Sequence, residues 1–296
     1  SAIRAGDGAL YVAGGMENMN LAPYLLPQAR TGYRLGNAEL VDAVVHDGLW
    51  CPFEQWPMGR AAEWIARTYE VTRADQDAYA VESHRRAIAA IDGGKFRAEI
   101  VGVPVPQKKG PPLLFDTDEC PRRDTSLEAL ARLSPAFEEG GTVTAGNAPG
   151  ITDGAAALVV ASQEKAKGLG IKPLARIIGY AQAAVKPVAL FTAPVYAVRK
   201  LLSHLDMSLD AIDLLEINEA FAAQVIANGN ELGVDWERVN VHGGAIALGH
   251  PIGCSGARVL TTLLYALKDR GLRTGLAALC LGGGEAVALA EEMLDS

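Results

Sequence analysis

A histidine and a cysteine near the end of the chain each stand beside glycines, in settings where they could do chemistry on carbon. His250 lies in Gly249-His250-Pro251, ahead of a helical pattern, and Cys280 begins the run Cys280-Leu281-Gly282-Gly283-Gly284. Glycines let the backbone approach a ligand closely, and successive free N–H groups can stabilise a developing negative charge. A thiol or thiolate can move a proton at carbon. The two segments therefore predict a site for carbon-acid chemistry.

The surroundings of these residues also predict how they ionise. The N–H-rich glycines after Cys280 are expected to lower the pKa of its thiol. His250 is expected to lie near a helix N-terminus, which disfavours the imidazolium and leaves a neutral ring. Asn218 follows an apolar run and opens a helical pattern, so its simplest role is an N-cap. Cys254 also opens a helix, where the dipole lowers a thiol pKa. Packing at the helix start is its simpler interpretation.

Composition places the chain among ordinary globular proteins. It has 296 residues, 21% charged and 49% hydrophobic, with a net charge of −8 that argues against a broad nucleic-acid surface. The four cysteines show no CxxC spacing, so we expect free thiols in a reducing compartment and no metal site. No apolar run is long enough for a membrane span, and residues 1–7 do not resemble a signal peptide. We expect a cytoplasmic protein.

Periodicity predicts strands alternating with helices, and therefore an α/β fold around a largely buried sheet. Residues 16–150 differ in composition, because prolines, tryptophans and charged residues are mixed with two helical patterns. We interpret them as an insertion over this core, with an exposed turn at 108–112. Thr72 is a plausible N-cap and Gly93-Gly94 a plausible end for one helix of the insertion. Leu260, Leu263, Leu264 and Leu267 form one apolar stripe on the last helix. The expected helices are 60–69, 73–92, 163–167, 194–205, 220–232 and 255–270, and the expected strands are 9–13, 154–161, 175–180, 213–217, 238–241, 276–281 and 286–290.

An internal similarity links the two ends of the chain. Residues 1–15 resemble residues 265–283 in having the tail of a helix, an apolar strand and a pair of glycines. If these are two copies of one unit, the beginning of the first copy is expected to lie upstream of Ser1. Any two helix–strand junctions have this general pattern, so the similarity by itself is weak.

Six longer motifs stand along the chain: Asn218-Glu219-Ala220-Phe221-Ala222, residues 243–253, Cys280-Leu281-Gly282-Gly283-Gly284, residues 13–19, residues 129–141 and residues 143–148. They resemble motifs of the thiolase family, the acetyl-CoA acetyltransferases and 3-ketoacyl-CoA thiolases. The resemblance runs in order along essentially the whole chain. It implies a thiolase fold of two similar α/β halves in an αβαβα layering, with an inserted loop domain and an incomplete N-terminal half. The implied boundaries are 1–17 and 151–191 for the first half, 18–150 for the loop domain and 192–296 for the second half.

The resemblance also implies roles for individual residues. Cys280 is the acid/base that moves the α-proton of an acyl-CoA, and His250 activates a nucleophilic cysteine and helps bind a thioester oxygen. Asn218 joins His250 in that oxyanion site through a water, and Gly282 supplies an N–H to a second oxyanion site. Glu219 is expected to be a structural hydrogen-bonding partner. The acyl-accepting cysteine of the family is expected upstream of Ser1, so we expect weak or no condensation from these 296 residues alone.

Substrate contacts match the family less well. Pro57 and Pro149 stand where the family commonly has a histidine and a serine, and proline offers no donor. Residues 190–193 replace a glycine-rich segment, and Glu285 follows the triple glycine unusually. Candidate phosphate neighbours are the basic residues Lys108, Lys109, Arg122 and Arg123, although solvated loop charges are the simpler interpretation. Residues that match the family's CoA channel are Met58, Phe137, Ala145, Ala220 and Phe221.

The sequence therefore predicts a thiolase-type acyltransferase that acts on acyl-CoA and CoA. Coenzyme A is a substrate here, and neither a metal nor a separate cofactor is implied. The family resemblance implies a homodimer or homotetramer. One alternative is a non-catalytic CoA-binding or scaffolding relative, with Pro57 and Pro149 marking a decayed site. Another is that Cys254 serves as a displaced nucleophile.

Overall fold

A four-stranded sheet forms the centre of the molecule in the computed structural model, which describes residues 1–294. Its strand order is β10 (Leu214–Ile217), β11 (Thr274–Leu281), β12 (Glu285–Met293) and β9 (Ala175–Ala184). β10 and β11 are parallel, with Ile217 opposite Ala278, and the other two pairings are antiparallel. The sheet is therefore mixed, and only the β10–β11 pair needs a helical crossover.

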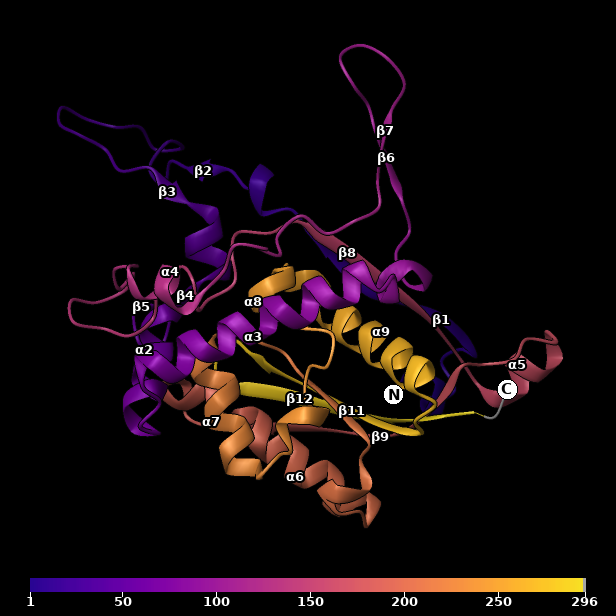
Figure 1. The fold of residues 1–296 in the computed structure, drawn as a ribbon. Coiled ribbons are helices and arrows are strands. Elements are labelled where there is room, and N and C mark those ends of the chain that lie inside the picture. Colours follow the sequence, from indigo (N-terminus) through magenta and orange to yellow (C-terminus); the bar gives the residue numbers. More distant parts are fainter. Residues whose placement is uncertain (295–296) are drawn as a thin grey trace.

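Helices cover both faces of this sheet (Figure 1). On one face, α6 (Ala193–Leu205) and α7 (Ala222–Leu232) share a buried cluster with Leu276 and Ala278. On the other face, α9 (Ile252–Arg270) packs on Ala277 and Leu279. Successive residues of β11 thus point to opposite faces, as the pleat of a strand requires. Burial on both faces explains why β11 is apolar without alternation.

The helix α9 also packs against a second sheet, formed by β1 (Leu10–Glu17) and the antiparallel β8 (Gly154–Ala161). The contact is close, because a Cβ at Gly15 would overlap the carbonyl oxygen of Gly253. The layers are therefore α6 with α7, the four-stranded sheet, α9, and the β1–β8 pair. These are four of the five predicted layers. Val12, Met16 and Val159 of the β1–β8 pair are exposed.

Residues between β1 and β8 form the predicted insertion. Its main helices are α2 (Met58–Thr68) and α3 (Arg73–Asp92), and Thr72 caps α3 in a reciprocal capping box with Asp75. The hairpin of β6 (Val103–Val105) and β7 (Leu113–Phe115) projects from the body (Figure 1), and its turn holds the predicted exposed residues 108–112. The other strands pair as β2 (Tyr24–Leu25) with β3 (Val41–Asp42), and β4 (Trp50–Cys51) with β5 (Trp56–Pro57).

The remaining helices are short. The α-helices are α1 (Ala2–Ala5), α4 (Leu127–Ala131), α5 (Gln163–Gly168) and α8 (Ala245–Leu248). The 3₁₀ helices are η1 (Met19–Leu21), η3 (Lys95–Ala98), η4 (Pro187–Thr192), η5 (Leu209–Ala211) and η6 (Trp236–Arg238), and η2 (Val44–Gly48) is a π-helix.

Most predicted elements are confirmed, and the differences have local causes. The first strand does not end at Gly14-Gly15, because β1 runs through both glycines to Glu17 in its ladder with β8. The strand predicted at 238–241 is wrong. That stretch makes only isolated bridges, from Val239 and Val241. The predicted boundary at 191/192 assigns β9 to the first half, whereas β9 is hydrogen-bonded to β12 in the sheet of the second half.

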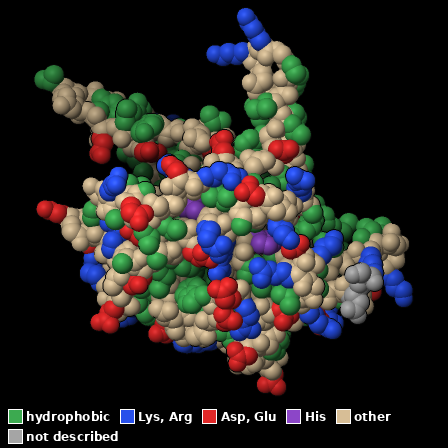
Figure 2. All heavy atoms as spheres, viewed as in Figure 1, with side chains coloured by type: hydrophobic (Ala, Val, Ile, Leu, Met, Phe, Trp, Pro, Cys, Tyr) green, Lys and Arg blue, Asp and Glu red, His purple; other side chains and the backbone are tan. Residues whose placement is uncertain are grey.

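Charged side chains of both signs are mixed over the face shown in Figure 2, and hydrophobic side chains gather on the projecting segments. Leu35 in one of these segments and Leu113 in the other are exposed. Within residues 1–294 no helix is both long enough and apolar enough to cross a membrane. The same residues contain no group of three or more His, Cys, Asp or Glu side chains that could hold a metal ion.

Candidate active site

The site forms where β10 and β11 end at the same edge of the sheet. Because the two strands are parallel, their carboxyl ends lie side by side, the usual position for a ligand crevice in such sheets. Asn218 directly follows β10, and its backbone N–H donates to the carbonyl oxygen of Ala278 at 2.9 Å. Cys280 lies two residues further along β11. Asn218 and Cys280 are thereby brought to one edge from positions 62 residues apart in the sequence.

His250 reaches this edge from the loop before α9. Its Nε2 is 3.2 Å from Nδ2 of Asn218, and its Nδ1 is 2.6 Å from Oγ of Ser255. The Ser255 hydroxyl donates its one hydrogen to the carbonyl oxygen of Pro251 at 2.9 Å. The proton between Ser255 and the ring therefore belongs to Nδ1, because the hydroxyl has no second hydrogen to give. Nε2 is left unprotonated, and it accepts the amide hydrogen of Asn218.

The imidazole is neutral at physiological pH. Burial lowers the pKa of His250 to about 4, and the positive charge of Arg258 lowers it further in the same direction. The predicted neutral ring is thus confirmed, but its main cause is burial rather than a helix terminus. Arg258 lies within 3.7 Å of the buried carboxylate of Glu216 on β10. The pKa of Glu216 is itself raised to about 8, chiefly by burial.

The thiol of Cys280 lies among apolar side chains and is only partly exposed. It packs against the cluster that contains Ala220 and Phe191, together with Met58 and Phe137. Burial in this environment raises the pKa of Cys280 to about 12. The prediction that the following glycines would lower this pKa is therefore wrong, because desolvation of the thiolate outweighs nearby N–H groups. The resting thiol is protonated.

The three glycines after Cys280 differ in what they require. Gly284 has φ +102° and Gly283 has φ +83°, so both adopt the backbone region that favours glycine. A Cβ at Gly284 would also lie 2.5 Å from the carbonyl oxygen of Val185. Gly282 is exposed and a Cβ there would meet nothing within 4 Å. Gly283 and Gly284 therefore shape the turn, and the open space at Gly282 leaves room for a ligand.

The prediction that Asn218 caps a helix is wrong, since α7 begins at Ala222 with Phe221 as its N-cap residue. The Asn218 side chain instead faces His250, and its Oδ1 is buried without a hydrogen-bond partner among the described residues. A buried amide oxygen of this kind is costly unless a ligand or water satisfies it. Asn218 thus has the properties of a ligand-facing group.

Glu219 has the predicted structural role, because its buried carboxylate accepts hydrogen bonds from three parts of the chain. Its carboxylate accepts hydrogen bonds from Tyr79 at 2.9 Å and Ser83 at 2.7 Å, both on α3. It also accepts bonds from the Asn240 side chain and the Ile246 backbone N–H, each at 3.0 Å. This carboxylate therefore joins the loop after β10 to α3 and to the glycine-rich loop that carries His250.

The residues expected to line a CoA channel mostly converge near Cys280. Met58, Phe137, Ala220 and Phe221 belong to one cluster with the thiol. Phe221 meets Phe137 and Phe191 edge to face, with ring centroids 6.2 Å and 5.4 Å apart. Ala145 is exposed and lies outside this cluster. Phe191 belongs to the segment that departs from the family pattern, and it contributes an aromatic wall that the sequence analysis did not assign.

The basic residues considered as phosphate neighbours are dispersed. Lys108 and Lys109 lie at the exposed turn of the projecting β6–β7 hairpin. Arg123 pairs with Asp92 at 2.6 Å, and the backbone N–H of Arg122 donates to a ring nitrogen of His84. These four side chains form no single cluster.

Cys254 is packed rather than reactive. It is 2% exposed, and burial raises the pKa of its thiol instead of lowering it as a helix N-terminus would. This arrangement favours the interpretation of Cys254 as a packing residue at the start of α9.

Two contributors to the site were missed at the level of sequence. Ser255 orients the imidazole, and Arg258 lies one turn further along the same face of α9. In the sequence, Ser255 and Arg258 can be related to His250 only by their spacing of five and eight residues. This spacing indicates a shared helix face only once α9 is known to begin at Ile252.

This chain belongs to the thiolase family. Residues 1–164 match the family model for "Thiolase, N-terminal domain" and residues 171–293 match "Thiolase, C-terminal domain". An acetyl-CoA acetyltransferase of Pseudomonas aeruginosa is 57% identical over 288 residues, which cover 97% of this chain and 73% of that protein. One from Chromobacterium violaceum is 53% identical, over 98% of this chain and 74% of that protein. The crystal structure of the Bacillus anthracis acetyl-CoA acetyltransferase superposes with a TM-score of 0.96 at 47% identity, over 99% of this chain and 74% of that one.

Proposed function

We propose that this chain catalyses acyl transfer of the thiolase type, joining two acyl thioesters of CoA into a 3-ketoacyl-CoA or cleaving that product with CoA. The observation that carries the proposal is the contact between the unprotonated Nε2 of His250 and Asn218, at the sheet edge where Cys280 also lies. The names of the similar proteins support acetyl-CoA as one substrate.

Cys280 is the acid and base at carbon in this proposal. In cleavage its thiol gives a proton to the carbon released when the carbon–carbon bond breaks, and the raised pKa keeps that proton in place at rest. In condensation the thiolate takes the α-proton of acetyl-CoA, and the C–H electron pair moves onto the thioester oxygen as an enolate. The Gly282 N–H stabilises the charge on that oxygen. Nε2 of His250 takes the proton of the acyl-accepting group, and the Nε2–H formed in this way then donates to the oxygen of the second acyl group, together with the second amide hydrogen of Asn218.

The apolar wall around Cys280 provides the place for the acyl chain. Met58, Phe137 and Phe221 exclude water from the thiol, and water exclusion strengthens the interactions that stabilise an enolate. Ala220 lies in the same wall, and Ala145 is proposed as an outer contact. Pro57 and Pro149 replace a histidine and a serine of the family, and proline has no hydrogen-bond donor. This difference supports a changed set of hydrogen bonds to CoA.

The group that accepts the second acyl chain is part of the same proposal. Burial of Cys254 leaves it unsuited to that role, and the expectation of an acyl-accepting cysteine upstream of Ser1 stays a prediction. Its consequence, weak condensation by these 296 residues, is tested by assaying turnover with a form of verified mass. Mass spectrometry after exposure to acetyl-CoA would locate any acyl adduct.

Deuterium exchange into acetyl-CoA tests the role of Cys280 without needing the acyl-accepting group. The protein is incubated with acetyl-CoA in D₂O, and deuterium at the acetyl methyl group is followed by mass spectrometry. We expect catalysed exchange that Cys280→Ala abolishes and that Cys254→Ala, a control at another buried cysteine, retains. Exchange that survives in Cys280→Ala would refute the assignment. CoA binding without any exchange would instead support the non-catalytic alternative.

The oligomeric part of the proposal is a homodimer or homotetramer. The exposed apolar side chains of Val12, Met16 and Val159 support further protein contact on the β1–β8 pair. Sedimentation velocity tests it, and a monomer at micromolar concentration would contradict it.

A further inference from the structure

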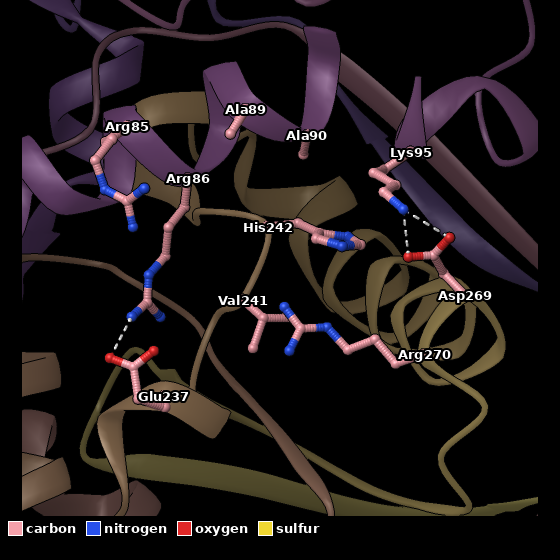
Figure 3. Close-up of a pocket in the computed structure, with 10 residues that line it drawn as sticks. All are labelled: Arg85, Arg86, Ala89, Ala90, Lys95, Glu237, Val241, His242, Asp269 and Arg270. Carbon is pink, nitrogen blue, oxygen red and sulfur yellow. Dashed lines mark hydrogen bonds and ion pairs between the residues drawn. The ribbon is translucent and has the colours of Figure 1, made fainter. Parts of the chain in front are cut away.

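A cavity of about 430 Å³ lies away from the proposed active-site residues, between α3, the loop after it and the end of α9 (Figure 3). Arg85 and Arg86 come from α3, Lys95 from η3, and Asp269 and Arg270 from the last turn of α9. This volume falls within the range of roughly 300–1,000 Å³ typical of small-molecule sites. The remaining lining residues are Ala89, Ala90, Glu237, Val241 and His242.

Positive charge dominates the lining, with four guanidinium or ammonium groups against two carboxylates. Asp269 is held by Lys95 at 2.7 Å, and Glu237 lies 3.7 Å from Arg86. Glu82, on α3, pairs with both Arg85 and Arg86 at 2.6 Å. Within residues 1–294 the Arg270 side chain makes no hydrogen bond or ion pair. In Figure 3 its guanidinium extends beside Val241 and approaches the cavity from the side opposite Arg86.

His242 forms a nearly buried part of the cavity wall. The residue is 6% exposed, and its Nδ1 has no hydrogen-bond partner among the described residues. Its ring packs edge to face on Phe96 with centroids 5.9 Å apart, which fixes its orientation. Burial lowers the pKa of His242 most, and the charge of Arg270 lowers it further, whereas Asp269 raises it and Lys95 has a smaller lowering effect. Arg270 is therefore the charged group with the largest effect on this wall.

Basic residues at helix C-termini often only offset the helix dipole. That explanation accounts for Lys95 and Arg270 individually. The α3 arginines both pair with Glu82. Arg270 is therefore the cavity cation whose side chain is left without an ion-pair partner within residues 1–294, and it faces a space large enough for a ligand. Guanidinium groups match the geometry of phosphate oxygens and bind them through paired hydrogen bonds.

We propose that this cavity binds a phosphate-bearing small molecule, with Arg270 as the principal contact. Arg86 and Lys95 add positive charge on either side of the bound phosphate. The cavity is larger than inorganic phosphate needs, so a phosphate ester fits it better than the free anion. This site is independent of the acyl-transfer chemistry proposed above.

Isothermal titration of the 296-residue protein with adenosine monophosphate, and separately with inorganic phosphate, tests the proposal. We expect saturable binding of both, with the ester tighter. Arg270→Gln should weaken binding at least about tenfold, because the loss of one charge-assisted hydrogen bond has an effect of this size. Asp269→Asn should tighten it about threefold by removing a negative charge and releasing Lys95. Lys268→Ala is the matched control, since Lys268 lies in the same helical turn over the ring of Tyr265.

The opposite signs of the two cavity variants separate a ligand site from a general structural effect. A disturbed helix end would weaken binding in both Arg270→Gln and Asp269→Asn. Absence of saturable binding, weaker binding in Asp269→Asn, or equal losses in Arg270→Gln and Lys268→Ala would each overturn the proposal. Arg270→Gln should also retain the rate of deuterium exchange into acetyl-CoA, which shows that the variant is folded.

Discussion

The thiol of Cys280 should stay protonated to a much higher pH than an ordinary cysteine. An ordinary cysteine has a pKa near 9.0, whereas burial raises that of Cys280 to about 12. At pH 8 the thiolate fraction is then about one in ten thousand, compared with about one in ten for the ordinary thiol. The difference is about a thousandfold in the concentration of the reactive form.

Alkylation by iodoacetamide, followed by peptide mass spectrometry, measures this property at each cysteine separately. We expect the rate at Cys280 to rise about tenfold for every pH unit from pH 7 to pH 10 without levelling off, because only the thiolate reacts. N-acetylcysteine in the same solution serves as the reference and should level off near pH 9. The slope is compared rather than the rate, since restricted access slows Cys280 equally at every pH.

A plateau in the Cys280 profile below about pH 9 would refute the reasoning. It would mean that the N–H groups of the following glycines stabilise the thiolate more than the apolar cluster disfavours it. The same experiment bears on mechanism, because a thiol that stays protonated at neutral pH is suited to donate a proton to carbon. Condensation then requires a base to take the proton, and its rate should rise with pH over the same range.

Three further predictions concern the neighbours of the site. Ser255→Ala removes the acceptor for Nδ1–H of His250, so the ring ¹⁵N NMR signals should change from those of the single Nδ1–H tautomer to those of a mixture of both tautomers; an unchanged spectrum would contradict the orienting role. Arg258→Met removes a positive charge, so the pKa of His250 measured by NMR titration should rise from about 4 toward its ordinary value, and a constant pKa would contradict the electrostatic effect. Gly284→Ala should lower the free energy of unfolding in urea by at least about 1 kcal/mol, because φ is +102° and a backbone oxygen lies 2.5 Å from the new Cβ. Gly282→Ala, with open space around it, should change this free energy little, and equal losses in the two variants would be evidence against the turn geometry.

The local part of the fold could be predicted from the sequence. Thr72 and Gly93 correctly bound α3, because a cap depends on a few neighbouring residues. The stripe containing Leu263 and Leu267 correctly predicts the buried face of α9, because helical spacing places these residues on one side. The strand predicted at 238–241 failed although β10 lies beside it, because Asn240 has φ +47° and its side chain bonds the backbone N–H and carbonyl oxygen of Ile217 in place of a ladder.

For the site, the identity of the candidate residues could be predicted from the chain, whereas their protonation and contacts depended on the fold. Motifs around Asn218, His250 and Cys280 indicate the family and the candidate residues, because each motif is a short contiguous run. The direction of the Cys280 pKa shift, the tautomer of His250 and the direct contact of Asn218 with His250 in place of a helix cap came only from the folded chain. These properties depend on burial and on contacts between residues distant in sequence, and neither a pKa nor a tautomer can be assigned before those contacts exist.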